Sequence, residues 1–312
     1  MKERVVFMGT PRFAVPSLRR LAEAYQVVAV VTRPDKATGR GRRVTSSPVK
    51  EAAQALGIPV MQPRTLRDEG AIAQLRGLKP EVIVVAAYGQ ILPPQVLAIP
   101  PFGCLNVHPS LLPKYRGPSP VAGALLAGEE ETGVTIMLMD EGMDTGPILA
   151  QIRVAIQREE TRGSLDERLG QLGAELLLET LPRWLAGEIE PRPQRHEEAT
   201  YTKVLKKEDG RIDWGSSAKE IWRRVRAYHP WPGAYTYWRG HRLKVLRAHP
   251  LGGARGGEPG SILTEGEGAA VLTGGGLLAL EEVQLEGKKP LGMAEFLRGQ
   301  EGFLGSRLGD GG

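Results

Sequence analysis

The sequence predicts an α/β protein in which a Rossmann-like domain with a mostly parallel sheet precedes a linker and a smaller OB-like β-barrel. Apolar β-branched runs alternate with helical patterns over residues 1–187, as in parallel sheets covered on both faces. The stretch that follows is polar, contains two prolines and lacks apolar periodicity, which is typical of a linker. Beyond it, short apolar runs separated by glycine and proline indicate a small barrel. We therefore expect a first domain over 1–187, a linker over 188–204 and a second domain over 205–312.

The expected strands of the first domain are short apolar runs, at residues 4–8, 27–31, 82–87, 103–107 and 134–139. The expected helices lie between or after them, at residues 13–24, 48–56, 66–78 and 164–185. Pro48 suits the first position of a helix, and Thr65 is the expected cap of the third helix. Ser164 and Glu167 form a capping-box pattern at the start of the fourth. The second domain should contain a helix at 217–228 and strands at 234–238, 243–246, 269–272 and 277–280.

Composition restricts the classes of site and the compartment. The single cysteine, Cys104, excludes an internal disulfide and a cysteine-cluster metal site. No segment approaches the ~20 apolar residues that span a bilayer, and the apolar run at 5–8 is too short for a signal peptide. We expect a cytoplasmic protein, and the resemblance given below adds the expectation of a bacterial monomer. The chain contains 29 Arg, 12 Lys and one asparagine, Asn106, a composition that suggests a heat-adapted host.

Positive charge is concentrated in two zones. Residues 33–50 carry six Lys or Arg against one acid, a net +5, and residues 203–249 carry twelve against four, a net +8. Two such zones attract a polyanion, most often nucleic acid. From charge alone, a solvated surface in an arginine-rich protein explains them equally well.

The most informative polar residues lie on the expected strand at 103–107. Asn106 and His108 are two residues apart and share a face, and Pro109 ends the strand. Both side chains would then lie at the carboxyl end of a parallel strand, where open α/β sheets bind ligands. The competing interpretation is a strand end with a hydrogen-bonded core histidine. Cys104 shares this face, but no base is fixed beside it, which favours a buried thiol over a nucleophile.

Two loops offer further candidates. Gly9-Thr10-Pro11 follows the first strand but lacks the G-x-G-x-x-G pattern, which argues against a dinucleotide site. The loop after 134–139 contains three acids, Asp140, Glu141 and Asp144. Spacing does not decide which of them faces His108. Three acids also suit a divalent cation, although acids in hairpin loops usually bind none.

Several motifs together resemble the methionyl-tRNA formyltransferases, within the wider superfamily that uses 10-formyltetrahydrofolate. They occur in order over the first domain, at residues 8–16, 33–41, 47–50, 87–93, 105–117 and 142–147. The linker, the basic second domain and the length also fit, so the resemblance extends over essentially the whole chain. One departure is Ser119-Pro120-Val121, where relatives have Ala-Pro-Ile. It lies beyond the catalytic strand.

The resemblance implies formyl transfer from 10-formyltetrahydrofolate, a co-substrate, to the α-amino group of methionyl-initiator tRNA, without a tightly bound cofactor or a metal. The implied catalytic residues are Asn106, His108 and Asp144. The implied folate-binding residues are Ala86, Ala87, Tyr88, Gly89, Gln90, Ile91, Leu92 and Ser110. The expected tRNA-binding residues are Arg33, Lys36, Arg40, Arg42, Arg43, Lys203, Lys206, Lys207, Arg223, Arg224 and Arg226. We expect the basic loop to guide the acceptor stem, with Arg40 foremost, and the second domain to contact the tRNA backbone.

Formyl transfer passes through a tetrahedral intermediate whose oxygen becomes negative, so the site needs hydrogen-bond donors there. Asn106 offers an amide and His108 a ring N–H, while Asp144 would hold a proton on His108 or relay one. A formyltransferase acting on a nucleotide-linked amino sugar or another small amine would share these three residues. A formyl-folate hydrolase, a non-enzymatic RNA-binding protein and a nucleotide-dependent oxidoreductase are the remaining alternatives.

Overall fold

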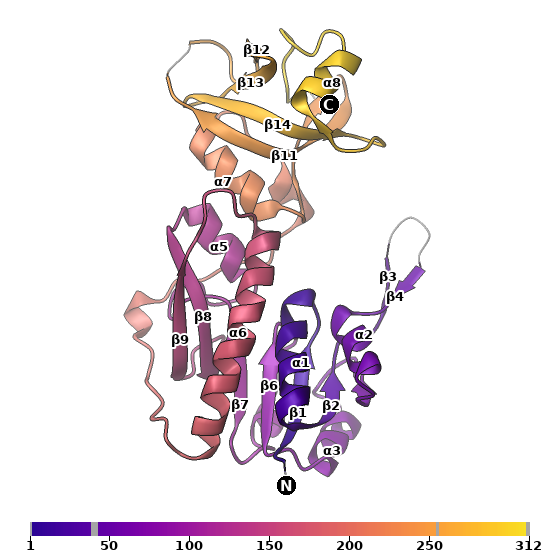
Figure 1. Cartoon of the computed structure of the whole chain (residues 1–312), viewed down its shortest axis with the longest axis vertical. Coiled ribbons are helices and arrows are strands. Elements are labelled where there is room, and N and C mark those ends of the chain that lie inside the picture. The colour runs from indigo at the N-terminus through magenta and orange to yellow at the C-terminus, as the bar shows by residue number, and fades with distance from the viewer. Residues whose placement is uncertain (1, 39–42, 254–255, 310–312) are drawn as a thin grey trace. The chain divides into compact units, whose positions relative to one another are not determined.

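The chain forms two compact units in the computed structural model, which describes residues 2–38, 43–253 and 256–309 (Figure 1). The first unit comprises Met1–Pro120, Glu131–Ile156 and Leu165–Lys203, and the second comprises Val121–Glu130, Gln157–Ser164 and Val204–Gly312. Of the linker that the sequence predicts at 188–204, residues 188–203 belong to the first unit and Val204 belongs to the second.

A seven-stranded sheet organises the first unit, with the order β5-β2-β1-β6-β7-β8-β9. Its strands are β1 (Arg4–Gly9), β2 (Gln26–Val31), β5 (Val60–Met61), β6 (Val82–Ala86), β7 (Cys104–His108), β8 (Glu131–Leu138) and β9 (Ile148–Ala155). Pairing is parallel from β5 to β7 and antiparallel from β7 to β9, so the sheet is mostly parallel as predicted. The chain continues from β1 to β2 on one side, and β6 lies on the other side of β1. The carboxyl ends of β1 and β6 therefore form the switch point at which such sheets bind ligands.

The other elements of the first unit are η1 (Arg12–Ala14), α1 (Val15–Ala24), β3 (Lys36–Thr38), β4 (Arg43–Thr45), α2 (Pro48–Ala55), α3 (Glu69–Gly77), α4 (Pro94–Leu97), α6 (Arg162–Leu185), whose first residues belong to the second unit, and η2 (His196–Glu198). Two expected helix starts are wrong. Asp68, not Thr65, caps α3 by accepting the Ala71 N–H. Helix α6 begins at Arg162, so Ser164 lies in its first turn and exchanges hydrogen bonds with Thr161.

Close backbone approaches hold this sheet against its neighbours. A Cβ on Gly173 of α6 would lie 2.8 Å from a methyl carbon of Val107, so the helix packs directly on the strand that contains Asn106 and His108. A Cβ on Gly9 would lie 2.9 Å from the Ala86 carbonyl. Gly9, the last residue of β1, therefore allows close packing of the β1 backbone against β6.

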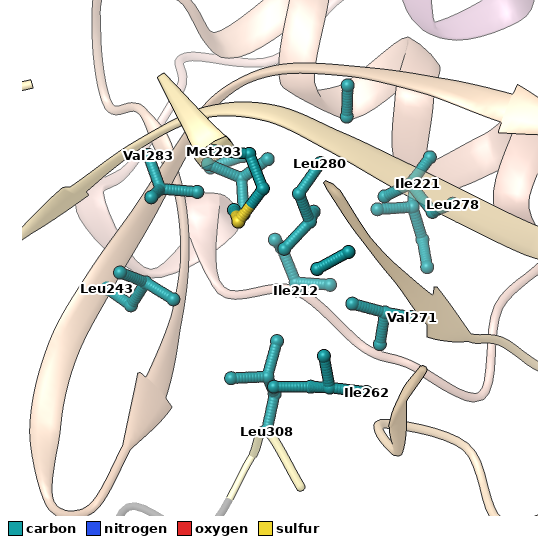
Figure 2. Packing of buried hydrophobic residues seen from close by; sticks show 14 of the residues in the cluster. Ile212, Ile221, Leu243, Ile262, Val271, Leu278, Leu280, Val283, Met293 and Leu308 are labelled. Carbon is teal, nitrogen blue, oxygen red and sulfur yellow. The ribbon is translucent and has the colours of Figure 1, made fainter. Parts of the chain in front are cut away.

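The second unit contains an antiparallel sheet with the order β10-β11-β14-β13-β12, and β15 pairs with β14. Its elements are α5 (Pro120–Ala127), η3 (Lys207–Gly210), α7 (Ala218–Tyr228), β10 (Ala234–Trp238), β11 (His241–Leu251), β12 (Ile262–Glu265), β13 (Gly268–Leu272), β14 (Leu277–Leu285), β15 (Leu291–Gly292) and α8 (Met293–Gly299). Side chains from these strands, α7 and α8 form one buried cluster, in which Ile221, Leu280 and Met293 lie together (Figure 2). The unit is the small barrel-like domain that the sequence predicts. Within the described residues, we find no helix with the length and apolar character needed to cross a bilayer.

Candidate active site

Asn106 and His108 occupy one face of β7, as the strand alternation predicts. Both residues are almost inaccessible, with 8% and 4% of their surface exposed, and the strand ends at His108 before Pro109. Polar groups buried to this extent require hydrogen-bond partners. Their partners come from the loop after β8 and from the turn at residues 115–117.

Asp144 connects the two strand residues. Asn106 donates from Nδ2 to Asp144 Oδ1 at 3.3 Å, and His108 Nδ1 lies 3.7 Å from Asp144 Oδ2. The same Oδ2 accepts the backbone N–H of Gly117 at 2.7 Å. Asp144 is thus the acid of the loop that faces His108, which the spacing of the three acids alone does not decide.

The other two acids of the loop have different positions. Asp140 accepts hydrogen bonds from the Gly142 N–H and from the Thr145 hydroxyl, so its carboxylate shapes the loop itself. Glu141 is exposed. Within the part of the chain that the structure describes, no group of three or more His, Cys, Asp or Glu residues is arranged to hold a metal ion.

The contacts of His108 define its tautomer. Its Nε2 lies 3.1 Å from the Tyr115 carbonyl oxygen, which only accepts, so Nε2 carries a hydrogen. Its Nδ1 then faces the Asp144 carboxylate. His108 Nδ1 and Asp144 Oδ2 are 3.7 Å apart, which is close enough for an electrostatic interaction when the ring is charged but longer than a direct hydrogen bond.

The predicted folate segment, residues 86–92, begins at the last residue of β6, beside the switch point. Tyr88 is 1% exposed, and its carbonyl accepts the Thr10 hydroxyl at 3.0 Å. Burial raises the pKa of Tyr88 to about 12, and among the described residues its hydroxyl has no hydrogen-bond partner. Leu92 is also buried, whereas Ile91 is 77% exposed. Ala87, Gly89 and Gln90 belong to the same loop, between the end of β6 at Ala86 and Ile91.

Ser110 follows β7 and is completely buried. Its hydroxyl donates to the Lys114 carbonyl at 2.7 Å, and its carbonyl accepts the Thr135 hydroxyl. Ser110 thus anchors the turn that follows β7. Cys104, two residues before Asn106, is also buried, and burial raises the pKa of its thiol to about 12. The expected buried, inert thiol agrees with this environment.

The predicted tRNA residues differ in what the structure describes. Arg40 and Arg42 lie outside the described residues, and the side chains of Lys36 and Arg43 lie outside them as well. Arg33 donates from Nη1 to the Gly89 carbonyl at 2.7 Å, so it joins the base of the basic loop to the folate segment.

The cations of the second zone fall into three groups. Lys203, Lys206 and Lys207 are exposed, and Arg223 and Arg224 are half-buried. Arg226 is 9% exposed and donates to the carbonyls of Glu160 and Gln157, and burial lowers its pKa. Arg226, which the sequence predicts to bind tRNA, is therefore bonded to the protein's own backbone and is not open to a phosphate.

Two functional candidates carry no sequence signal of their own. Arg116 lies within the motif at 105–117, where the resemblance implies no role for it, and Gln194 lies in the expected linker. The structure places Arg116 next to Gly117, and the Gln194 amide donates to the carbonyls of Asp144 and Gly146.

Comparison with known proteins gives matches over nearly the whole chain. Residues 3–181 match the family described as Formyl transferase, and residues 204–301 match Formyl transferase, C-terminal domain. The methionyl-tRNA formyltransferase of Roseiflexus sp. (strain RS-1) is 54% identical over 313 residues, covering 99% of this chain and 96% of the relative. That of Thermus thermophilus is 52% identical over 307 residues, covering 98% and 99%.

Solved structures with the same fold are more distant in sequence. An N-formyltransferase from Helicobacter canadensis, in complex with folinic acid and dTDP-3-aminofucose, matches with a TM-score of 0.67 at 20% identity, covering 90% of this chain and 99% of that one. HypX from Aquifex aeolicus, in complex with tetrahydrofolic acid, matches with a TM-score of 0.63 at 22% identity, covering 95% and 47%. At these identities the likeness establishes the fold alone.

Proposed function

This chain belongs to the methionyl-tRNA formyltransferases, and we propose that Asn106, His108 and Asp144 carry out its reaction on 10-formyltetrahydrofolate. The observation that carries the function is the identity of 52–54% to methionyl-tRNA formyltransferases over nearly the full length of both chains. The chain transfers a formyl group to the α-amino group of methionyl-initiator tRNA. The convergence of Asn106 and His108 on Asp144 supports the proposed residue roles.

The reaction begins when the α-amino nitrogen attacks the formyl carbon. The C=O electron pair moves to oxygen, the tetrahedral intermediate collapses, and the bond from carbon to folate N10 breaks. The attacking nitrogen loses one proton and N10 gains one, so the transfer is balanced without a redox step. A free α-amino group titrates near ~7.7–8.0, so the nucleophile needs little activation at neutral pH.

Asn106 is suited to stabilise the oxyanion. Its amide nitrogen carries two hydrogens, and among the described residues only Asp144 Oδ1 accepts from it. The second hydrogen is available for the developing negative oxygen. Because the side chain is 8% exposed, water competes little for this donor.

The His108 and Asp144 pair is suited to move the proton. Nε2 of His108 is engaged by the Tyr115 carbonyl, and its Nδ1 faces Asp144 Oδ2 at 3.7 Å, so the ring is oriented towards the carboxylate. We assign to this pair the transfer of a proton from the attacking nitrogen towards N10, directly or through water. In this proposal Asn106 stabilises the oxyanion and the pair of His108 and Asp144 moves the proton, so Asn106 and His108 are not two equivalent oxyanion donors.

The folate and tRNA contacts complete the proposal. The segment 86–92, at the switch point of the sheet, would hold the pterin, and Ser110 would support the turn beside it. The basic loop 33–50 would meet the acceptor stem, while Lys203, Lys206, Lys207, Arg223 and Arg224 would contact phosphates. We omit Arg226 from this set because its donors are bonded to Glu160 and Gln157. We further propose that residues 1–187 form the catalytic domain, 188–204 a linker and 205–312 the tRNA-binding domain. In this proposal the protein acts as a cytoplasmic monomer.

Single-turnover formylation tests the function. The protein is mixed with 10-formyltetrahydrofolate and either charged initiator tRNA or an amino-sugar nucleotide, and the formylated product is measured. We expect fast transfer to methionyl-tRNA and negligible transfer to the sugar. Preferential formylation of the sugar would refute the tRNA assignment.

A further inference from the structure

Arg116 is a completely buried cation between two residues that contact the catalytic groups. The carbonyl of Tyr115 accepts from His108, and the N–H of Gly117 donates to Asp144. Among the described residues, no carboxylate forms an ion pair with the Arg116 guanidinium. Its acceptors are instead Gln194 Oε1, the His196 ring nitrogen Nδ1 and the Tyr201 hydroxyl. Burying a charge that has only neutral acceptors lowers the stability of the folded protein, so a buried arginine at this position calls for a functional explanation.

Gln194 links this guanidinium to the loop that contains Asp144. Its Oε1 accepts from Arg116 Nε at 3.1 Å and from Nη2 at 2.7 Å. Its Nε2 donates to the Asp144 carbonyl at 2.9 Å and to the Gly146 carbonyl at 2.7 Å. The side chain is 6% exposed, and both amide hydrogens and both acceptor positions are used.

The loop needs such a restraint. Asp144 has a φ of +54°, in the left-handed region, which costs a non-glycine residue about 1–2 kcal/mol. A conformation of this kind persists only when its surroundings determine it. The hydrogen bonds from Gln194 hold the carbonyls on either side of Thr145, next to the carboxylate that meets Asn106 and His108.

The segment that follows Gln194 is fixed on the same turn. The Arg116 N–H donates to the Thr200 carbonyl at 2.9 Å, and the Thr202 N–H donates to the Arg116 carbonyl at 2.8 Å. The Thr200 hydroxyl accepts the Tyr115 N–H. The stretch from 194 to 202 is therefore attached to the catalytic turn at several points.

We propose that Arg116 and Gln194 are positioning residues that hold Asp144 in its reactive conformation, and that residues 194–202 are a structural part of the active site. Neither side chain needs to touch substrate for this role. The guanidinium fixes the Gln194 oxygen, and the amide then fixes the backbone that aims the Asp144 carboxylate. The inference rests on the proposed function of Asp144.

Gln194→Glu separates positioning from stability. The carboxylate still accepts from Arg116 and adds an opposite charge, which favours the folded state. It loses both N–H donors and places a negative oxygen against two carbonyls, which should displace the Asp144 loop. We expect a folded protein whose kcat falls about 10- to 100-fold, because misplacement of a catalytic group by ~1 Å costs up to that much. The KM values for both substrates should remain unchanged.

Gln151→Glu is the matched control. The Gln151 amide also donates to a backbone carbonyl, that of Leu112, and to the Thr135 hydroxyl, and neither acceptor belongs to the Asp144 loop. This variant should change the melting temperature but not kcat. If Gln194→Glu retains the wild-type kcat, or if it and the control slow the reaction equally, the inference is overturned.

Two further variants keep the test decisive. Arg116→Lys keeps the positive charge but loses the two guanidinium N–H groups that hold Gln194 Oε1. As a single variant it should lower kcat. In the double variant with Gln194→Glu it should cause little further loss of kcat. If Gln194→Glu does not fold, Arg116→Lys is judged by the same kcat and KM criterion. Asp144→Asn provides the reference. If it reacts at the wild-type rate, the proposed role of Asp144 fails; a slow Asp144→Asn beside a normal Gln194→Glu overturns only the positioning role.

Discussion

Replacing Asn106 with alanine should slow formyl transfer far more than it weakens folding. In the resting site the amide donates to Asp144 Oδ1 at 3.3 Å, slightly longer than the usual 2.7–3.2 Å. A hydrogen bond to a charged group contributes about 1.5–3 kcal/mol at good geometry, so this long one should lie at or below the lower limit. The loss in folding free energy should therefore be modest.

The transition state depends on the same side chain more strongly. Removing one donor from a buried oxyanion site typically costs about 2.7–4 kcal/mol, or about 100- to 1000-fold in kcat. We expect that loss in single-turnover formylation of methionyl-tRNA measured by rapid quench, with little change in KM for either substrate. Asn106→Asp should be at least as slow, because an ionised carboxylate cannot donate and would repel both Asp144 and the oxyanion.

Cys104→Ala is the control on the same face of the same strand. It alters a buried side chain two residues away without touching the amide, so it should lower stability and leave kcat near the wild-type value. A kcat for Asn106→Ala within about tenfold of wild type, equivalent to about 1.4 kcal/mol, would refute the oxyanion role. Equal loss in both variants would point to general damage to β7.

Three further outcomes are expected. Cys104 should resist thiol-specific reagents in the folded protein at pH 8 and react after denaturation, because burial raises its pKa to about 12; rapid native labelling would contradict the buried thiol. Arg33→Ala should weaken folate binding, measured by fluorescence titration, because it removes the hydrogen bond to Gly89; a change only in tRNA affinity would favour direct tRNA binding by Arg33 instead. A double Lys206→Ala, Lys207→Ala variant should reduce the slope of log affinity against log salt by about 1 for each phosphate that is no longer neutralised, whereas an unchanged slope would remove these lysines from the interface.

The sequence can predict the strand that contains Asn106 and His108 because local physics defines it. Alternating side chains on a short apolar run place the two residues on one face, and Pro109 ends the run. Strand β9 (Ile148–Ala155) is not among the expected strands, because its polar residues interrupt the apolar run. The alternation of polar and apolar residues from Gln151 to Val154 is nevertheless typical of a half-buried strand, so a sequence signal is present. The apolar run of β8 (Glu131–Leu138) does not reveal whether this strand pairs parallel or antiparallel with its neighbours.

The choice of Asp144 requires the resemblance, because the path of the loop depends on distant partners. Gln194 donates to carbonyls 50 and 48 residues earlier in the chain, and Gly117 lies 27 residues before the carboxylate it contacts. A segment with prolines and no periodicity gives no indication of such contacts. The features that indicate a linker at 188–204 are therefore compatible with a stretch of little regular structure that crosses the loop containing Asp144.

The turn at residues 115–117 shows how one short segment can orient several groups of the proposed active site. Its first carbonyl holds His108, its central side chain holds Gln194, and its last N–H holds Asp144. Gly117 has a φ of +103°, and a Cβ there would lie 3.0 Å from the Thr202 carbonyl oxygen, so a larger residue would strain or displace the turn. Because all three contacts arise from consecutive residues, a small displacement of this turn must move the histidine and the aspartate together. The distance between His108 and Asp144 is thereby protected from independent motions of β7 and of the loop after β8.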